Sequence, residues 1–297
     1  MQSSVLTTPQ THKTRQISPL IFAAEMLAET NVPFAGNFCG ILKKDMTPEE
    51  LQKLRKRPID PLMCVAAEAT SHMIIREILR TGIKNILFPG CKLSTICIHM
   101  ALAGSISRAV ELDVPETMQK KRSIIDRLQK EKIVGSLIHR LIMREGDPTS
   151  LLEISRACSR LDESQNVASI SLNFLTPYPL DEKERIVKNH REVLNDYKGV
   201  FITSDLDSLE FICCRPGGID AYRKHMYAQT GIDVIPNTFK TMHDARGFFQ
   251  DLGFKIIGDY SLSEMAPQCK SIARLGLNKN ETSNLLVNRP LWVMSAN

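Results

Sequence analysis

The sequence reads Asn85-Ile86-Leu87-Phe88-Pro89-Gly90 near the end of its first third, an apolar run that a glycine closes. This run predicts a buried strand, and the helical spacing of apolar residues in 96–102 predicts a helix after the loop. A second run, Ala109-Val110-Glu111-Leu112-Asp113, predicts the next strand. Strand, loop, helix and strand in this order are the repeating unit of a parallel α/β sheet.

The same alternation continues to the end of the chain. Further strands are predicted at Leu137–Met143, Ala168–Phe174, Val200–Ser204, Lys255–Tyr260 and Leu291–Met294, with helical patterns between them. Ahead of the first strand, helices are predicted at Leu20–Glu29, at 47–58 and at Pro61–Arg80, with Asn31–Gly40 as a break. The pattern as a whole predicts a sheet covered by helices.

The composition is that of an ordinary globular chain. Its 297 residues are 43% hydrophobic and 24% charged, which excludes fibrous, collagen-like and low-complexity classes. A net charge of +5 is too small to indicate a nucleic-acid partner, and the basic run Lys120–Lys132 is predicted to be an exposed helix face. No apolar run reaches the roughly eighteen residues that a membrane span needs.

The eight cysteines show neither a CxxC pair nor the Cys/His spacing of a zinc site, so no metal is expected. The opening segment Met1–Gln16 is polar and lacks the apolar core of a signal peptide. Free thiols without a leader favour the reducing cytosol, and a cytoplasmic location is therefore expected.

Ligands of open parallel sheets bind beyond the carboxyl ends of the strands. Gly90 there lets a ligand approach the backbone, and Asp113, about twenty residues later, is placed to accept both hydroxyls of a ribose. Asp147 and the loop Asn173–Tyr178 follow the next two strands. Taken singly, each is better explained structurally: Asp147 suits a helix cap, Asn173 a turn and Tyr178 half-buried packing.

Several stretches together resemble one protein family. They are Val110–Glu116 with Lys120 and Lys121, Tyr178–Lys183, Gly199–Leu206, and the early segment from Ile17 to Ala35. The chain resembles class I S-adenosylmethionine-dependent methyltransferases, of the branch with leucine carboxyl methyltransferases and polyketide O-methyltransferases. The resemblance runs from about residue 17 to the C-terminus.

The resemblance implies a Rossmann-like, seven-stranded, mostly parallel sheet with an antiparallel last strand. It also implies an N-terminal helical lid. The expected organisation is a flexible tail at 1–16, a helical lid region at 17–81 and a methyltransferase-like α/β domain at 82–297. The expected activity is O-methylation of a small molecule or a carboxylate, with S-adenosylmethionine as cofactor and without a metal.

The resemblance also implies roles by position. Pro89, Gly90, Cys91 and Lys92 would hold the methionine end of the cofactor. The acidic strand end, Glu111 and Asp113, would hold the ribose, and Asp147 would lie on the adenine side. Asn173 and Tyr178 would face the methyl group, with Tyr178 as the candidate acid–base residue.

Three positions depart from the family pattern. Lys92 stands at or beside the second glycine of the loop, Asn173-Phe174 replaces a glutamate and a glycine, and the arginine of the preceding helix is absent from Ala66–Thr70. These departures support a second hypothesis, a non-catalytic binding or scaffolding protein of the same fold. A third hypothesis, a nicotinamide-dinucleotide enzyme, predicts a fuller GxGxxG motif, which the sequence lacks.

Overall fold

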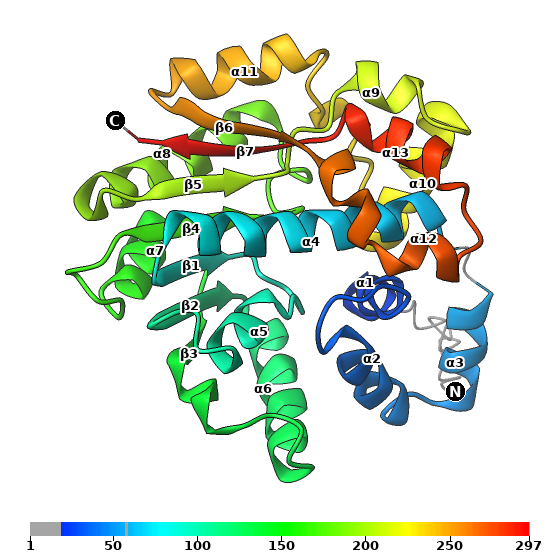
Figure 1. Cartoon of the computed structure of the whole chain (residues 1–297), viewed down its shortest axis with the longest axis horizontal. Coiled ribbons are helices and arrows are strands. Elements are labelled where there is room, and N and C mark those ends of the chain that lie inside the picture. The colour runs from blue at the N-terminus through cyan, green and yellow to red at the C-terminus, as the bar shows by residue number, and fades with distance from the viewer. Residues whose placement is uncertain (1–18, 57–58, 297) are drawn as a thin grey trace, which may run out of the picture.

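A single sheet organises the chain (Figure 1). The structure, a computed structural model, describes residues 19–56 and 59–296, so the predicted tail at 1–16 lies outside the described residues. Seven strands follow the order β3-β2-β1-β4-β5-β7-β6, and β7 runs antiparallel to its neighbours β5 and β6. The predicted mostly parallel sheet with a reversed last strand is confirmed.

The strand boundaries agree best with the prediction at the start of the sheet. The strands are β1 (Asn85–Pro89), β2 (Arg108–Asp113), β3 (Leu141–Glu145), β4 (Val167–Ser171), β5 (Val200–Thr203), β6 (Lys255–Ser261) and β7 (Pro290–Ser295). β3 begins later than predicted because Ser136–Arg140 form a 3-10 turn. β4 ends earlier because Asn173 takes a φ of 51°, outside the extended region.

Helices cover both faces of the sheet. One face carries α4 (Pro61–Thr81), α5 (Ile96–Leu102) and α6 (Pro115–Lys130), and the other carries α7 (Leu151–Cys158), α8 (Leu180–Tyr197) and α11 (Met242–Asp251). Successive strand residues point to opposite faces, so Ile86 and Phe88 pack in the first layer and Leu87 in the second. Because both faces of β1 are buried, its sequence is apolar without alternation.

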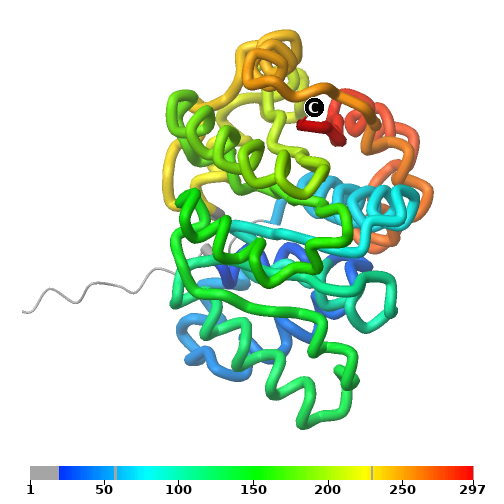
Figure 2. Tube along the Cα trace, turned by 90° about the vertical axis from the view of Figure 1, so that its left-hand side faces the viewer, coloured from blue at the N-terminus to red at the C-terminus, as the bar shows by residue number. Residues whose placement is uncertain are grey.

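A further group of helices lies beyond the carboxyl ends of the parallel strands, on the right in Figure 1. It contains α1 (Pro19–Ala28), α2 (Ala35–Lys44), α3 (Pro48–Arg55), α9 (Leu209–Cys213), α10 (Gly218–Thr230), α12 (Lys270–Arg274) and α13 (Lys279–Val287). Figure 2 shows the molecule from the left-hand side of Figure 1, so that the N-terminal helices lie behind the sheet. Part of the predicted break is helical, because α2 buries Phe38, Ile41 and Leu42 on one side.

Glu68 of α4 holds the N-terminal helices against the rest of the molecule. Its fully buried carboxylate accepts the backbone N–H groups of Asn31 at 3.1 Å, Lys270 at 3.0 Å and Ser271 at 3.0 Å. Burial opposes ionisation, but these bonds and the contact with His72 lower the pKa of Glu68 to about 2. The turn before α2 and the start of α12 are thereby fixed to α4.

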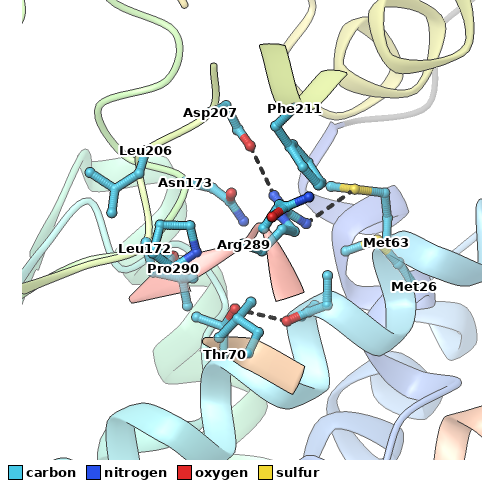
Figure 3. Close-up of a pocket in the computed structure, with 15 residues that line it drawn as sticks. Met26, Met63, Thr70, Leu172, Asn173, Leu206, Asp207, Phe211, Arg289 and Pro290 are labelled. Carbon is cyan, nitrogen blue, oxygen red and sulfur yellow. Dashed lines mark hydrogen bonds and ion pairs between the residues drawn. The ribbon is translucent and has the colours of Figure 1, made fainter. Parts of the chain in front are cut away.

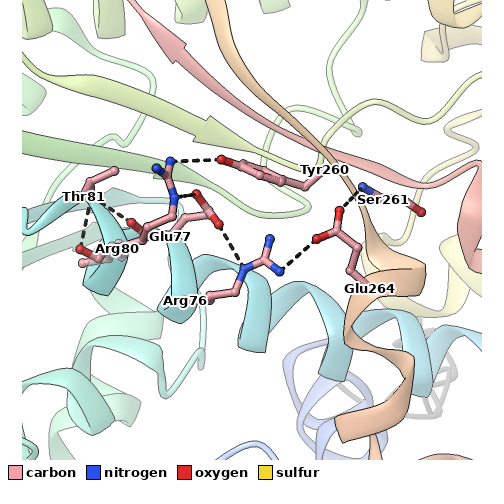
Figure 4. Close-up of polar contacts among 8 residues, drawn as sticks. Arg76, Glu77, Arg80, Thr81, Tyr260, Ser261 and Glu264 are labelled. Atoms are coloured by element: carbon pink, nitrogen blue, oxygen red, sulfur yellow. Dashed lines mark hydrogen bonds and ion pairs between the residues drawn. The ribbon is translucent and has the colours of Figure 1, made fainter.

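A second network joins α4 to the far edge of the sheet (Figure 4). Glu77 accepts hydrogen bonds from Arg76 Nε at 3.0 Å and Arg80 Nε at 2.7 Å. Arg76 also pairs with Glu264 at 2.9 Å, and Arg80 donates to the Tyr260 hydroxyl at 2.9 Å. α4 is therefore tied to β6 and to the 3-10 turn that follows it.

Candidate functional site

The turn after β1 and the tip of β2 meet at the carboxyl edge of the sheet. Gly90 has a φ of 63° and donates its N–H to the Leu112 carbonyl at 2.8 Å. Lys92 has a φ of 50°, unusual for a residue other than glycine, and its N–H donates to Asp113 Oδ2 at 2.8 Å. The glycine turn and the acidic tip, which the sequence analysis placed in one site, are brought together.

Asp113 already has backbone partners on both carboxylate oxygens. Oδ1 accepts the Val114 N–H at 2.8 Å while Oδ2 accepts that of Lys92, and only 6% of the residue is exposed. A carboxylate oxygen can accept more than one hydrogen bond, so each oxygen of Asp113 can accept a further one. The residue therefore stabilises the turn as well as presenting a carboxylate at the edge.

Glu111 lies beneath the edge, so a ligand there would not reach it. Its carboxylate forms an ion pair with Lys121 Nζ of α6 at 2.7 Å, and both side chains are fully buried. Lys121 also donates to the Ser94 carbonyl at 2.5 Å and so supports the turn from below. The expectation that Lys120–Lys132 is an exposed face is wrong for Lys121, because this side chain faces the sheet.

The loop after β4 is held by hydrogen bonds to Asp205, a residue that the sequence analysis did not assign to the site. Asp205, which follows β5 and is 2% exposed, accepts the N–H groups of Phe174 at 3.0 Å and Leu175 at 2.9 Å and the Ser171 hydroxyl at 2.5 Å. Its second oxygen is buried without a hydrogen-bond partner. A carboxylate directly after a predicted strand, at the same edge as Asp113, was the available signal.

Phe174 fills the space in front of Gly90. A methyl group added at Gly90 would lie 2.1 Å from Cδ2 of the Phe174 ring, inside van der Waals contact. The ring is 4% exposed and lies edge-on to Tyr178 at 5.8 Å and His190 at 6.3 Å between centroids. The backbone that Gly90 leaves accessible is thus covered by the chain's own side chain.

Lys92 closes the other side of the same turn. Its Nζ donates to the Asn173 carbonyl at 2.8 Å, and burial lowers the pKa of the ammonium group. A cavity of about 70 Å³ lies beside it, between α1 and the turn, lined also by Cys91, Ser94 and Asn173. Pro89 and Cys91, the other predicted loop residues, are buried, Pro89 within β1 and Cys91 above Lys121.

Asp147 and Tyr178 follow β3 and β4, respectively. The exposed Asp147 accepts the backbone N–H of Thr149 at 2.9 Å and its hydroxyl at 2.8 Å, which stabilises the turn before α7. Burial, together with the carboxylates of Asp147 and Asp113, raises the pKa of Tyr178. The three side chains therefore share one electrostatic environment.

A second cavity opens beyond β4 and β5 (Figure 3). Its volume is about 20 Å³, and Met63, Asn173, Asp207, Phe211 and Arg289 contribute to its lining. Arg289 pairs with Asp207 at 3.0 Å and also donates to the Met63 sulfur at 3.5 Å. The sequence analysis did not find this charged pair, which comes from the segments after β5 and before β7.

Two other features are absent from residues 19–56 and 59–296. These residues contain no group of three or more His, Cys, Asp or Glu side chains able to hold a metal ion. No helix within the same residues is long and apolar enough to span a membrane. All eight cysteines are free, and only Cys213 and Cys214 are exposed.

Comparisons with known proteins give similarity of fold. No protein-family model matches the chain, and no curated protein matches its sequence. The strand order, with β7 antiparallel between β5 and β6, is that of a Rossmann-like sheet with a reversed last strand. Several solved methyltransferases match the chain in part, at sequence identities of 10–12% and TM-scores below 0.5.

Three of these structures show the identities, TM-scores and coverages of the matches. An O-methyltransferase family protein from Burkholderia thailandensis is 10% identical, with a TM-score of 0.47 over 79% of this chain and 58% of that one. Magnesium protoporphyrin IX methyltransferase from Synechocystis, solved with bound SAH, is 12% identical, with a TM-score of 0.46 over 86% and 98%. An O-methyltransferase family 2 protein from Planctomyces limnophilus, solved with apigenin, is 12% identical, with a TM-score of 0.47 over 89% and 66%.

Proposed function

We propose that the chain is an S-adenosylmethionine-dependent methyltransferase that methylates a small molecule or a carboxylate. The observation that carries the proposal is that the Gly90 turn and the Asp113 carboxylate meet at one carboxyl edge, with Tyr178 packed on the Phe174 ring that covers Gly90. This is the edge at which open α/β sheets bind their ligands. The solved methyltransferases of similar fold are in keeping with the proposal.

The residues fit some parts of the cofactor better than others. Asp113 retains acceptor capacity for ribose hydroxyls, and the 70 Å³ cavity beside Lys92 suits an amino-acid arm. The Phe174 ring, however, covers Gly90, one of the residues expected to hold the methionine end. Cofactor binding therefore requires this ring to move.

When bound, the cofactor would supply an electrophilic methyl group for in-line displacement. The chain's own contribution would be alignment of the two reactants, which can supply about 7–11 kcal/mol of the barrier, and exclusion of water. Tyr178 is half-buried against Phe174, and its raised pKa keeps the hydroxyl protonated, so we assign it to donate a hydrogen bond to the acceptor oxygen.

Calorimetric titration with S-adenosylhomocysteine, the demethylated cofactor, tests the proposal. We expect micromolar binding by the wild type and, in Asp113→Asn, a loss of about 1–3 kcal/mol because the charge-assisted ribose bonds weaken. Asp162→Asn is the matched control: Asp162 also accepts a backbone N–H and a hydroxyl, both from Ser164, but lies just before β4 begins. Equal effects of the two substitutions would remove Asp113 from the site.

A second candidate is a binding or scaffolding protein of the same fold that does not use the cofactor. The contact of Phe174 with Gly90 and the bond from Lys92 to Asn173 favour it, because both close the edge. This candidate predicts no heat of binding at millimolar S-adenosylhomocysteine. The same titration therefore separates the two functions.

A further inference from the structure

We propose that the methyl acceptor is a hydroxylated aromatic small molecule: its ring body binds in a cavity between α9, α11 and β7, and its hydroxyl group passes Phe211 to lie beside Asn173. The proposal rests on the proposed function, because it names the acceptor class and the acceptor-binding residues of that site. It is carried by a large cavity that the expected cofactor residues do not line, and by two smaller cavities that follow it.

The cavity for the ring body, the outer cavity, has a volume of about 510 Å³. Its lining includes Glu210 and Cys214 on and after α9, Met242 and Arg246 on α11, and Trp292 on β7. Small-molecule sites are commonly clefts of about 300–1,000 Å³. None of the residues expected to hold the cofactor, all of which the structure describes, lines the outer cavity. The outer cavity is therefore open to a second reactant.

The outer cavity adjoins the cavity of Figure 3, the inner cavity, because Phe211 and Pro290 line both. The inner cavity adjoins the one beside Lys92, because Leu172 and Asn173 line both of these. The strand order β1-β4-β5-β7 places the three cavities one after another along the carboxyl edge. An acceptor in the outer cavity and an amino-acid arm beside Lys92 would therefore approach Asn173 from opposite sides, as in-line displacement requires.

The wall of the outer cavity favours a flat aromatic body. The Arg246 guanidinium lies 5.1 Å from the centre of the Trp292 ring and pairs with Asp259 at 2.6 Å. One face of the guanidinium thus covers Trp292, while the Arg246 side chain is 41% exposed and lines the outer cavity. Guanidinium groups stack on aromatic faces, so the second face suits the ring of a ligand. Phe211 and Met242 add apolar surface.

The inner cavity selects the group that is methylated. Its volume is about 20 Å³, and one water-sized group needs about 10–15 Å³, so it admits a hydroxyl group but not the two oxygens of a carboxylate. Arg289 offers donors and Asp207 an acceptor in its lining, and a hydroxyl group can accept and donate at once. There the hydroxyl lies beside Asn173, the first residue of the loop that also carries Tyr178. Its methylation forms an ether, releases the hydroxyl proton to water and leaves S-adenosylhomocysteine.

Trp292, the only tryptophan of the chain, reports on the outer cavity. Titration with 7-hydroxycoumarin, which absorbs where tryptophan emits, should quench the Trp292 fluorescence in a saturable way. 7-Methoxycoumarin, its methyl ether, should bind about tenfold more weakly, because the inner cavity has no room for the added methyl group. In Phe211→Leu, which shortens the side chain between the two cavities, this difference should disappear.

Alkylation of Cys214 places a bulky group in the outer cavity. Cys213 and Cys214 are exposed, whereas the other six cysteines are buried, and of the two exposed thiols only Cys214 lines the outer cavity. N-Cyclohexylmaleimide is therefore reacted with Cys213→Ser, which keeps Cys214, and with Cys214→Ser, which keeps Cys213. Labelling at Cys214 should abolish quenching by 7-hydroxycoumarin, and labelling at Cys213, the matched control, should leave it unchanged. Thermal unfolding checks that both labelled proteins stay folded.

Saturable quenching that labelling at Cys214 removes, together with weaker binding of the methyl ether, supports the proposal. The proposal is overturned by absence of saturable quenching, by quenching that survives labelling at Cys214, or by equal affinity of the wild type for the two coumarins. A difference that persists in Phe211→Leu removes Phe211 from the path of the hydroxyl. In each case binding of S-adenosylhomocysteine leaves the proposed function standing. If the wild type does not bind S-adenosylhomocysteine, the proposed function fails, and the acceptor assignment fails with it even where 7-hydroxycoumarin binds.

Discussion

Replacement of Phe174 by alanine should separate stability from ligand affinity. The ring is 4% exposed and packs against Gly90, Tyr178 and His190. Truncation of a buried phenylalanine costs about 3–5 kcal/mol of the free energy of unfolding, from lost burial and the cavity that remains. The same truncation removes the side chain that covers Gly90.

The gain in affinity follows from the cost of moving the ring. Exposing a fully buried phenylalanine costs about 1.5–3 kcal/mol, and this cost is subtracted from cofactor binding in the wild type. Phe174→Ala avoids it, so S-adenosylhomocysteine should bind about ten- to 150-fold more tightly. Urea denaturation measures the loss of stability, and calorimetry on the same preparation measures the gain in affinity.

Phe249→Ala is the control for general loosening of the core. Phe249, on α11, is fully buried in the same hydrophobic cluster but does not contact Gly90. The Phe249→Ala variant should lose a similar amount of the free energy of unfolding and should bind S-adenosylhomocysteine no more tightly than the wild type. The reasoning is refuted if Phe174→Ala is destabilised as expected and its affinity for S-adenosylhomocysteine does not rise, because the ring would then not occupy space that the cofactor needs.

Three further predictions test residues that support the site and the fold. Asp205→Asn should lower the free energy of unfolding by about 1–3 kcal/mol in urea, because an amide holds the three donors of the loop less well than a carboxylate. Glu111→Gln should cost about 3–5 kcal/mol because it leaves Lys121 charged and buried, and combining Glu111→Leu with Lys121→Met should recover most of that loss. The pKa of Glu68, lowered from 4.5 to about 2, predicts stability that is fully present above pH 4.5 and is lost as pH falls towards 2; Glu68→Gln should flatten this part of a denaturation profile against pH.

The elements that could be predicted from sequence are those whose first and last residues are determined by the sequence immediately around them. β1 and α5 agree with the prediction to the residue, because an uninterrupted apolar run and a helical pattern flank the turn at Gly90. α10 was not predicted. Its buried residues Tyr222 and Met226 pack on Met26 and Met63, which come from distant helices, so tertiary contacts decide this element.

The buried lysine shows a signal that was present and misread. Lys121 falls on the same helical face as Met118 and Ile125, three residues before and four after it, and that face is the one that packs on the sheet. A lysine there needs an opposite charge, and Glu111 is the one carboxylate in the interior of the neighbouring strand. The basic residues led to the prediction of an exposed face, whereas the helical periodicity of α6, which was not used, indicates burial of Lys121.

Phe174 shows what a sequence alone leaves open. A bulky ring in place of a small residue indicates that the loop differs from the pattern of the family that the sequence resembles, but the direction of the ring depends on the backbone to which it is attached. That backbone is set by Asp205, 31 residues further along the chain, which binds the Phe174 N–H and turns the ring towards Gly90. Whether Gly90 is covered is therefore decided by a contact between the residues that follow β4 and β5. The gain in affinity of Phe174→Ala for S-adenosylhomocysteine measures the binding free energy that the covering ring removes.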